Sequence, residues 1–267
     1  MPIINSKIRY AFGCLIFVVF LVASLVSCIN SNNSAENVYR YDSYLKTTPE
    51  IRVLLHDNIK EIQIEINKPY SISNFNNHEK LADKTGLKKS ILYLKSGDFR
   101  TRSLSSDTAH NAPTTFVKAN GNISIFANNG YVKLNNSTYS GKVILIPKDN
   151  DKFSILEEIG IEGFLPGVVE GEMPIMWNND ALQAQVIAVR TYVLYKRKIK
   201  GNALYHINKL DLAYKGSYMN QSKSKDIVDK TRGTVMVYDW NLFPGYFHST
   251  CGGHTEDINL VFNLRSI

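Results

Sequence analysis

The stretch Phe164–Arg190, with the sequence FLPGVVEGEMPIMWNNDALQAQVIAVR, joins an apolar segment to a strongly patterned helix. Glu172 is predicted to lie on the short turn between them. Pro174 makes that turn rigid, because its ring fixes φ and removes an N–H donor. A carboxyl group held on a rigid connection beside a helix is suited to general acid–base chemistry. The stretch therefore predicts both a long helix and a candidate acid.

The helix after this turn has clear signals at both ends. Asn178 or Asn179 can cap its start, and it is predicted to run to about Lys200, where Gly201 offers a stop. Residues spaced four, three and four apart form one apolar stripe: Leu182, Val186, Val189 and Val193. The stripe predicts a face that packs against the rest of the domain.

Residues from about 50 to 157 are predicted to form mainly strands. Glu61–Ile66 alternates between polar and apolar residues, which is the period of a half-buried strand. Further candidate strands are Ile51–Leu55, Ile91–Leu94, Asn122–Phe126, Tyr131–Leu134 and Val143–Ile146. Ser103–Asn120 is polar and is predicted to be a loop. Near the C-terminus, Thr234–Tyr238 and Pro244–His248 are predicted strands joined at Asp239–Leu242.

These patterns predict an α+β fold. A strand-rich N-terminal portion, about 49–157, precedes a mixed part, about 158–267, in which one long helix packs on strands. The length allows one large domain or two small ones with a real hydrophobic core.

The first 28 residues have the pattern of a targeting segment. Lys7 and Arg9 precede the apolar run Ala11–Val26, which is too short and too punctuated for a comfortable membrane span. Leu25–Cys28 (LVSC) resembles the lipobox of bacterial lipoproteins, which predicts lipidation at Cys28 and a membrane anchor. A cleaved secretory signal or an uncleaved anchor is the alternative, and each of these readings predicts export to the cell envelope. Residues 29–48 read as a flexible tether.

Charge and cysteine content narrow the class of protein. Removing the two basic residues of the leader lowers the formal net charge from +7 to +5, a modest excess that suits anionic polymers or lipids. No Lys/Arg cluster indicates nucleic-acid binding. Cys14 lies in the leader and Cys28 would be lipidated, so Cys251 is left alone and no disulfide within the domain is predicted.

Two segments resemble the SpoIID/LytB family of bacterial cell-wall proteins. Residues 167–192 carry the pattern GVV-x-x-EMP…AL-x-AQ…A-x-RTY, and Tyr246–Glu256 (YFHSTCGGHTE) is similar to the family segment YHSTSGGHTE. The resemblance covers about Ile51–Phe262, most strongly Phe164–Tyr195 and Thr231–Glu256. The family usually continues with further strands, which leaves open a truncated or divergent end.

The resemblance implies an activity and a catalytic residue. It implies lytic transglycosylation of peptidoglycan between N-acetylmuramic acid and N-acetylglucosamine, with Glu172 as the acid and then the base. It also implies a preference for strands stripped of stem peptides, and hence a partner amidase. The main rival is a non-enzymatic amidase enhancer that binds the wall and stimulates another hydrolase. No cofactor is implied.

The surroundings of Glu172 bear on this role. A general acid must hold its proton near neutral pH, which an apolar setting favours. Candidates for that setting are Val168, Val169, Met173, Ile175, Met176 and Trp177. Glu170 and Glu162 are the alternative carboxylates, and on an extended segment Glu170 would share a face with Glu172. A carboxylate pair would suit a hydrolase, whereas transglycosylation needs only one.

Other residues that match family positions are candidate substrate-binding groups. Gln185 and Arg190 could bind a sugar or, for Arg190, orient Glu172. The alternative is that both satisfy polar groups at the helix interface. The polar side chains of the second segment are candidates for a cleft wall opposite Glu172: His248, Ser249, Thr250 and His254. The alternative is a hydrogen-bonded loop that stabilises the domain.

Two other roles for the second segment, a zinc site and a nucleophilic cysteine, are disfavoured. His248, Cys251 and His254 have the spacing of zinc ligands, but a closed site needs four and no fourth is evident. Some family members are understood to bind zinc through a Cys/His loop after the long helix. Here only His206 remains at that place, so no metal is predicted. A nucleophilic Cys251 would make an amidase or peptidase, but the family's serine at this position indicates that the thiol is incidental.

Overall fold

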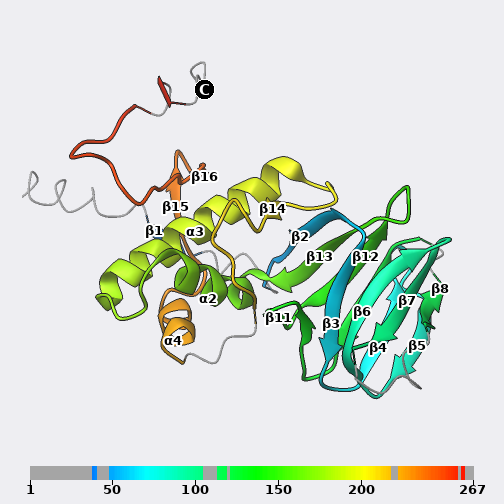
Figure 1. Ribbon diagram of the computed structural model, residues 1–267. Helices are drawn as coiled ribbons and strands as arrows, with labels where there is room; N and C mark the ends of the chain where they lie inside the picture. The colour runs from blue at the N-terminus through cyan, green and yellow to red at the C-terminus, as the bar shows by residue number, and fades with distance from the viewer. Residues whose placement is uncertain are drawn as a thin grey trace, which may run out of the picture.

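The structure is a computed structural model that describes residues 38–40, 48–104, 113–118, 121–217, 222–257 and 260–261, with the backbone alone for 38–40. The predicted leader, Cys28 and most of the tether lie outside these residues. Figure 1 shows the strand-rich part on one side of the molecule and the helices on the other. The predicted α+β class and its order along the chain are confirmed. Among the described residues, no helix has both the length and the apolar character that crossing a membrane requires.

The larger sheet forms the centre of the strand-rich part. Over the described residues it has seven strands in the order β14 (Ile207–Asn208), β2 (Glu50–Ile59), β13 (Phe153–Gly160), β12 (Lys142–Pro147), β9 (Ile123–Ala127), β4 (Tyr70–Asn74) and β5 (Lys80–Lys84). β14 pairs with β2 in parallel and the other neighbours are antiparallel. Because β14 follows the long helix in sequence, this pairing joins the later part of the chain to the sheet.

A second sheet packs against the first (Figure 1). Its six described strands are β11 (Ser137–Tyr139), β10 (Val132–Leu134), β3 (Glu61–Ile66), β6 (Leu87–Lys95), β7 (Asp98–Ser103) and β8 (Thr114–Lys118), in that order. Aromatic pairs join the two layers: Phe99 meets Phe153 edge-on at 5.4 Å, and Tyr70 stacks on Phe116 at 6.2 Å. Alternating aliphatic residues fill the space between them, as sheet-on-sheet packing requires.

The predicted strands of the N-terminal, strand-rich part are found, with shifts of a few residues at their ends. In β3, residues Ile62, Ile64 and Ile66 are buried and the residues between them are not, so the period-two pattern was correctly interpreted. The prediction of a loop over Ser103–Asn120 is wrong for Thr114–Lys118, which is β8. Phe116 and Val117 are buried there against the core, and this tertiary packing outweighs the polar character of the flanking sequence.

The long helix is α3, Asn179–Lys200, and it matches the prediction closely. Asn178 caps it by accepting a hydrogen bond from the Asp180 N–H at 2.7 Å, and Gly201 ends it with a φ of 51°. The four residues of the apolar stripe are fully buried. Two shorter helices, α2 (Ile161–Glu172) and α4 (Ser222–Lys230), pack against it and against each other.

A third sheet covers α3. Its described strands are β1 (Val38–Arg40), β15 (Thr234–Tyr238) and β16 (Asn241–Leu242), in that order. β15 confirms a predicted strand, but the predicted strand Pro244–His248 is wrong. The chain turns at Asp239 and Trp240, which both have positive φ, and the returning strand ends at Leu242. Pro244 lacks an N–H for a ladder, and the following amides bond to local carbonyls instead.

Candidate active site

Glu172 is the last residue of α2, so the prediction that it lies on a turn between an apolar segment and the long helix is corrected. The apolar segment is itself helical, and the turn begins at Met173. The Glu172 carboxylate lies at the C-terminal end of this helix. Its Oε1 atom accepts a hydrogen bond from the Ala213 N–H at 2.7 Å. Among the described residues, Oε2 accepts no hydrogen bond, so one oxygen is anchored and the other is available.

Glycines on α2 allow the loop that carries Ala213 to approach the helix. A Cβ atom added at Gly171 would lie 1.6 Å from the Ala213 carbonyl oxygen, and one added at Gly167 would lie 1.9 Å from that of Gly216. Side chains at these positions would push the loop away. Lys215 strengthens the contact, because its Nζ donates to the Glu170 carbonyl at 2.9 Å. The glycine spacing of four residues therefore determines how Glu172 is held.

Glu170 and Glu172 do not form a pair. The prediction that they share a face assumed an extended segment, but on a helix residues two apart point in different directions. Glu170 accepts a short hydrogen bond from the Ser224 hydroxyl of α4, while Glu172 faces Ala213. A two-carboxylate hydrolase site at these residues is therefore not formed.

The apolar residues near Glu172 divide into three groups. Val168 and Val169 are fully buried and belong to the core. Met173 and Ile175 are half-buried and pack against that core. Met176 and Trp177 are exposed, at 85% and 53%, on the turn that begins α3. They leave an apolar surface open to solvent rather than covering the carboxylate as the sequence suggested.

Arg190 has a buried partner other than Glu172. Its side chain is 1% exposed, and its Nε and NH2 atoms donate to the two oxygens of Glu162 at 2.9 and 2.8 Å. NH1 donates to the Thr234 carbonyl at 3.0 Å. Arg190 thus joins α2, α3 and β15, which matches the second of the two readings left open for it. Its role in binding a sugar stays a prediction without support from these contacts.

The remaining predicted substrate-binding residues are not gathered around Glu172 by any described contact. Gln185 is half-buried on α3, and its side chain makes no hydrogen bond among the described residues. His248, Ser249, Thr250 and His254 are exposed. Figure 1 shows their segment running outward beyond β15 and β16, away from α2. His254 contacts Glu256 at 3.1 Å in this segment. Their roles as a cleft wall stay predictions.

His206, which the sequence left as the one plausible metal ligand after the long helix, has both ring nitrogens engaged. Nδ1 accepts from the Arg52 N–H at 3.0 Å, and Nε2 lies 3.3 Å from the Gly201 carbonyl. Burial and nearby positive charges lower the pKa of His206 to about 4, so the ring is neutral at pH 7. Within the described ranges, no group of three His, Cys, Asp or Glu side chains is arranged to hold a metal ion. Cys251 is exposed and free.

Sequence reasoning missed a buried carboxylate, Glu157 on β13. It is fully buried, and burial raises its pKa. The Tyr214 hydroxyl donates to Oε2 at 2.6 Å, and the Ser217 hydroxyl and Gly141 N–H donate to Oε1 at 2.5 and 3.0 Å. The sequence contained a signal for this residue. Glu157 is spaced by two residues from its neighbours in the series Phe153, Ile155 and Ile159, so all four lie on the inward face of one strand.

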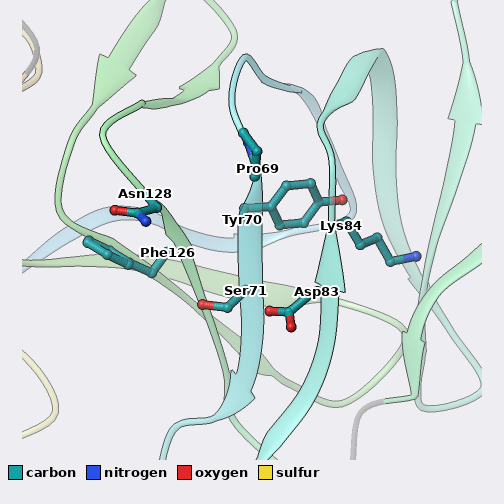
Figure 2. Close-up of a pocket in the computed structure, with 7 residues that line it drawn as sticks. All are labelled: Pro69, Tyr70, Ser71, Asp83, Lys84, Phe126 and Asn128. Carbon is teal, nitrogen blue, oxygen red and sulfur yellow. The ribbon is translucent and has the colours of Figure 1, made fainter.

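A pocket of about 400 Å³ lies elsewhere, on the strand-rich part (Figure 2). It is lined by Pro69, Tyr70, Ser71, Asp83, Lys84, Phe126 and Asn128. Its carboxylate, Asp83, forms an exposed ion pair with Lys80. None of the predicted site residues takes part in this pocket, and it is separate from Glu172.

Comparison with known proteins bears directly on the segment that contains Glu172. The SpoIID family, described as stage II sporulation protein, matches residues 149–238. This range includes β13, the three helices of the described residues and β15. The resemblance to the SpoIID/LytB family is confirmed. No solved structure matches the chain.

Three curated relatives show how far the SpoIID resemblance extends. An uncharacterized protein of Brachyspira hyodysenteriae is 33% identical over 49% of this chain and 36% of its own length. The amidase enhancer of Bacillus subtilis is 33% identical over 37% of this chain and 13% of its own. Stage II sporulation protein D of Bacillus amyloliquefaciens is 28% identical over 38% of this chain and 35% of its own. The chain thus covers at most about a third of the length of these relatives.

Proposed function

We propose that this protein acts on the bacterial cell wall and cleaves peptidoglycan glycan strands by lytic transglycosylation, with Glu172 as general acid and then base. The observation that carries the proposal is the state of the Glu172 carboxyl group. One oxygen is fixed by the Ala213 N–H, and the other has no partner among the described residues. A fixed acid with one available oxygen is the arrangement that proton transfer to a bound substrate requires.

The reaction would proceed in two proton transfers. Protonated Glu172 gives its proton to the glycosidic oxygen as the bond from C1 of the muramic acid residue to that oxygen breaks. The Glu172 carboxylate then takes the proton of the 6-hydroxyl group on the same muramic acid residue. The oxygen of this hydroxyl group attacks C1 at the same time and closes the 1,6-anhydro ring. The products are a 1,6-anhydromuramic end and a free N-acetylglucosamine end. No water is consumed and the acid is regenerated.

The turn that follows Glu172 in sequence carries residues that suit a saccharide substrate. Trp177, five residues later, is about half exposed on a turn closed by its N–H bond to the Pro174 carbonyl at 3.0 Å. An indole offers a flat apolar face together with a polar N–H. The Lys223 ammonium group bonds to the Trp177 carbonyl at 3.2 Å and holds positive charge nearby, which suits an anionic polymer.

Product analysis on purified glycan tests this proposal. Strands stripped of stem peptides would be incubated with the protein, and the products would be separated and identified by mass spectrometry. Anhydromuramic ends that form with the wild type support transglycosylation. Products that have gained water instead would indicate a hydrolase, and the proposed chemistry would be wrong.

A second candidate function is stimulation of a wall amidase without catalysis. The match to the Bacillus subtilis amidase enhancer is the observation that favours it. This protein would then bind denuded strands without cutting them and would raise the rate of a purified wall amidase in the same assay. The two functions differ in one readout, which is whether anhydromuramic ends form when no amidase is present.

A further inference from the structure

We infer that the buried carboxylate of Glu157 is a positioning residue for Glu172, because it fixes the loop Leu212–Ser217 whose Ala213 N–H holds the Glu172 carboxyl group. This inference rests on the catalytic role proposed for Glu172. The two carboxylates do not contact each other. They are joined by the chain on one side, through β13 and α2, and by the loop on the other.

The loop is attached to Glu157 at two places. The Tyr214 hydroxyl donates to Oε2 at 2.6 Å, and the Ser217 hydroxyl donates to Oε1 at 2.5 Å. Tyr214 also packs its ring against Phe164 of α2, with 4.4 Å between the ring centroids. Ser140 reinforces the second attachment, since its N–H donates to the Ser217 hydroxyl at 2.6 Å. The loop is thus clamped directly beside Ala213.

The contact at α2 makes the position of this loop critical. The Ala213 carbonyl lies where a Cβ of residue 171 would be, so the loop packs directly on the helix backbone. The Lys215 N–H faces the Gly167 carbonyl at 3.4 Å, which is too long for a strong bond. The loop is also held by the Lys215 ammonium group on the Glu170 carbonyl and by the Ser217 N–H on the Thr138 carbonyl at 3.1 Å. The two bonds to Glu157 are among the shortest of its attachments, and a small shift of the loop would release the Glu172 oxygen.

Stability alone is a poor reason for a carboxylate at this place. Burying a charged group carries a large desolvation cost, and replacing buried ionic groups by well-packed apolar ones is often neutral or stabilising. Burial raises the pKa of Glu157, as that cost requires, and the three donors oppose the rise. The two directed hydrogen bonds from Tyr214 and Ser217 give the loop a fixed geometry, which an apolar side chain at position 157 would not do.

The test measures the Ala213 amide directly. In protein labelled with ¹⁵N-alanine, the Ala213 resonance is identified by its loss in Ala213→Ser, and its hydrogen-exchange rate is measured. Tyr214→Phe removes one hydroxyl group and keeps the ring on Phe164. We expect this change to raise the exchange rate of Ala213 about tenfold, the effect of leaving one buried hydrogen-bond acceptor without its donor. On glycan strands it should lower kcat by a similar factor and leave KM unchanged.

The matched control is Tyr139→Phe. Tyr139 is a buried tyrosine whose ring lies 6.2 Å from that of Tyr214, and no hydrogen bond is described from it to Glu157. Tyr139→Phe should change the Ala213 exchange rate by less than about twofold, even if it lowers the melting temperature as much as Tyr214→Phe does. Equal effects of the two variants, or no effect of Tyr214→Phe, would overturn the inference.

Glu157→Gln provides a second arm if Tyr214→Phe does not fold. The amide keeps one oxygen for Ser217 and Gly141 but places an NH₂ group opposite the Tyr214 hydroxyl. It should raise the Ala213 exchange rate at least threefold, and an unchanged rate would contradict the inference. The exchange readout needs no substrate. If the wild-type protein cleaved no glycan, the proposed function would be refuted. The hydrogen-exchange rate of Ala213 would still decide whether Glu157 positions Glu172.

Discussion

The guanidinium group of Arg190 and the carboxylate of Glu162 form a two-point ion pair inside the protein, with N–O distances of 2.9 and 2.8 Å. Their side chains are 1% and 10% exposed. The pair joins α3 to α2, and one further hydrogen bond, from Arg190 to the Thr234 carbonyl, extends it to β15. It therefore holds the helix that ends at Glu172 in a fixed orientation relative to the long helix.

Loss of one partner of this pair should be strongly destabilising. We predict that Arg190→Ala lowers the free energy of unfolding by about 3–5 kcal/mol, because it leaves the Glu162 charge buried and unpaired. Urea denaturation followed by circular dichroism measures this. The double variant Glu162→Gln with Arg190→Met should recover at least half of the loss. A loss below about 1 kcal/mol, or additive losses in the double variant, would contradict the interpretation.

The close approach of the loop to α2 predicts a sharp difference between two glycines of the same helix. Gly171→Ala should destabilise the protein by about 1–3 kcal/mol, because its Cβ would overlap the Ala213 carbonyl. Gly163→Ala is the control. Its Cβ would meet only the Ile159 side chain at 3.2 Å, and alanine favours the helix by about 1 kcal/mol. Similar melting temperatures for the two variants would show that the loop does not pack as described.

Stability should fall as the pH is lowered from 7 to 5. The pKa of His206 is about 4 in the folded protein and ordinarily 6.5, so the unfolded chain binds more protons between these values. The contribution of neutral His206 to the free energy of unfolding is complete above pH 6.5 and is lost as the pH falls toward 4. We expect a loss of about 2 kcal/mol between pH 7 and pH 5 from this residue. Burial also lowers the pKa of His56 to about 4, which adds to the loss.

Urea denaturation at both pH values, repeated with His206→Asn, checks this prediction. The asparagine oxygen can still accept the Arg52 N–H but carries no titrating group. The variant should be less stable at pH 7 and should lose less stability on acidification than the wild type. An equal loss in both proteins would show that His206 does not contribute.

Tyr70 provides a contrast to the buried Tyr214. Its hydroxyl is buried and has no hydrogen-bond partner among the described residues. An unpaired buried hydroxyl costs free energy, so Tyr70→Phe should be neutral or stabilising by up to about 1 kcal/mol. Thermal unfolding measures the difference. Marked destabilisation would mean that the hydroxyl has a partner, such as a bound water.

The long helix was predictable because its signals are local. The cap at Asn178, the stop at Gly201 and the stripe from Leu182 to Val193 lie in one continuous segment and agree with one another. Local signals failed for α2, whose Pro166 and glycines have low helix propensity. Packing against the loop Leu212–Ser217 requires those glycines, and no single-sequence pattern reveals a contact between segments about 45 residues apart.

The candidate site was predictable in its acid but not in the surroundings of that acid. Glu172 was identified by its motif, whereas its partner Ala213 is a backbone N–H, which no side-chain pattern can reveal. For Arg190 the sequence left open a sugar-binding role and a role at the helix interface, because its ion pair with Glu162 depends on the orientation of two helices. Glu157 could have been identified from the inward face of β13, but two of its three donors come from a loop that follows α3.

The measurement that tests the central claim most directly compares two carboxylates on one helix. Glu172→Gln and Glu170→Gln would each be incubated with denuded glycan strands, and the rate at which anhydromuramic ends form would be compared with that of the wild type. We predict a loss of at least a hundredfold for Glu172→Gln, the typical contribution of a general acid, and a loss of less than about tenfold for Glu170→Gln. Anhydromuramic ends forming at the wild-type rate in Glu172→Gln would contradict the account.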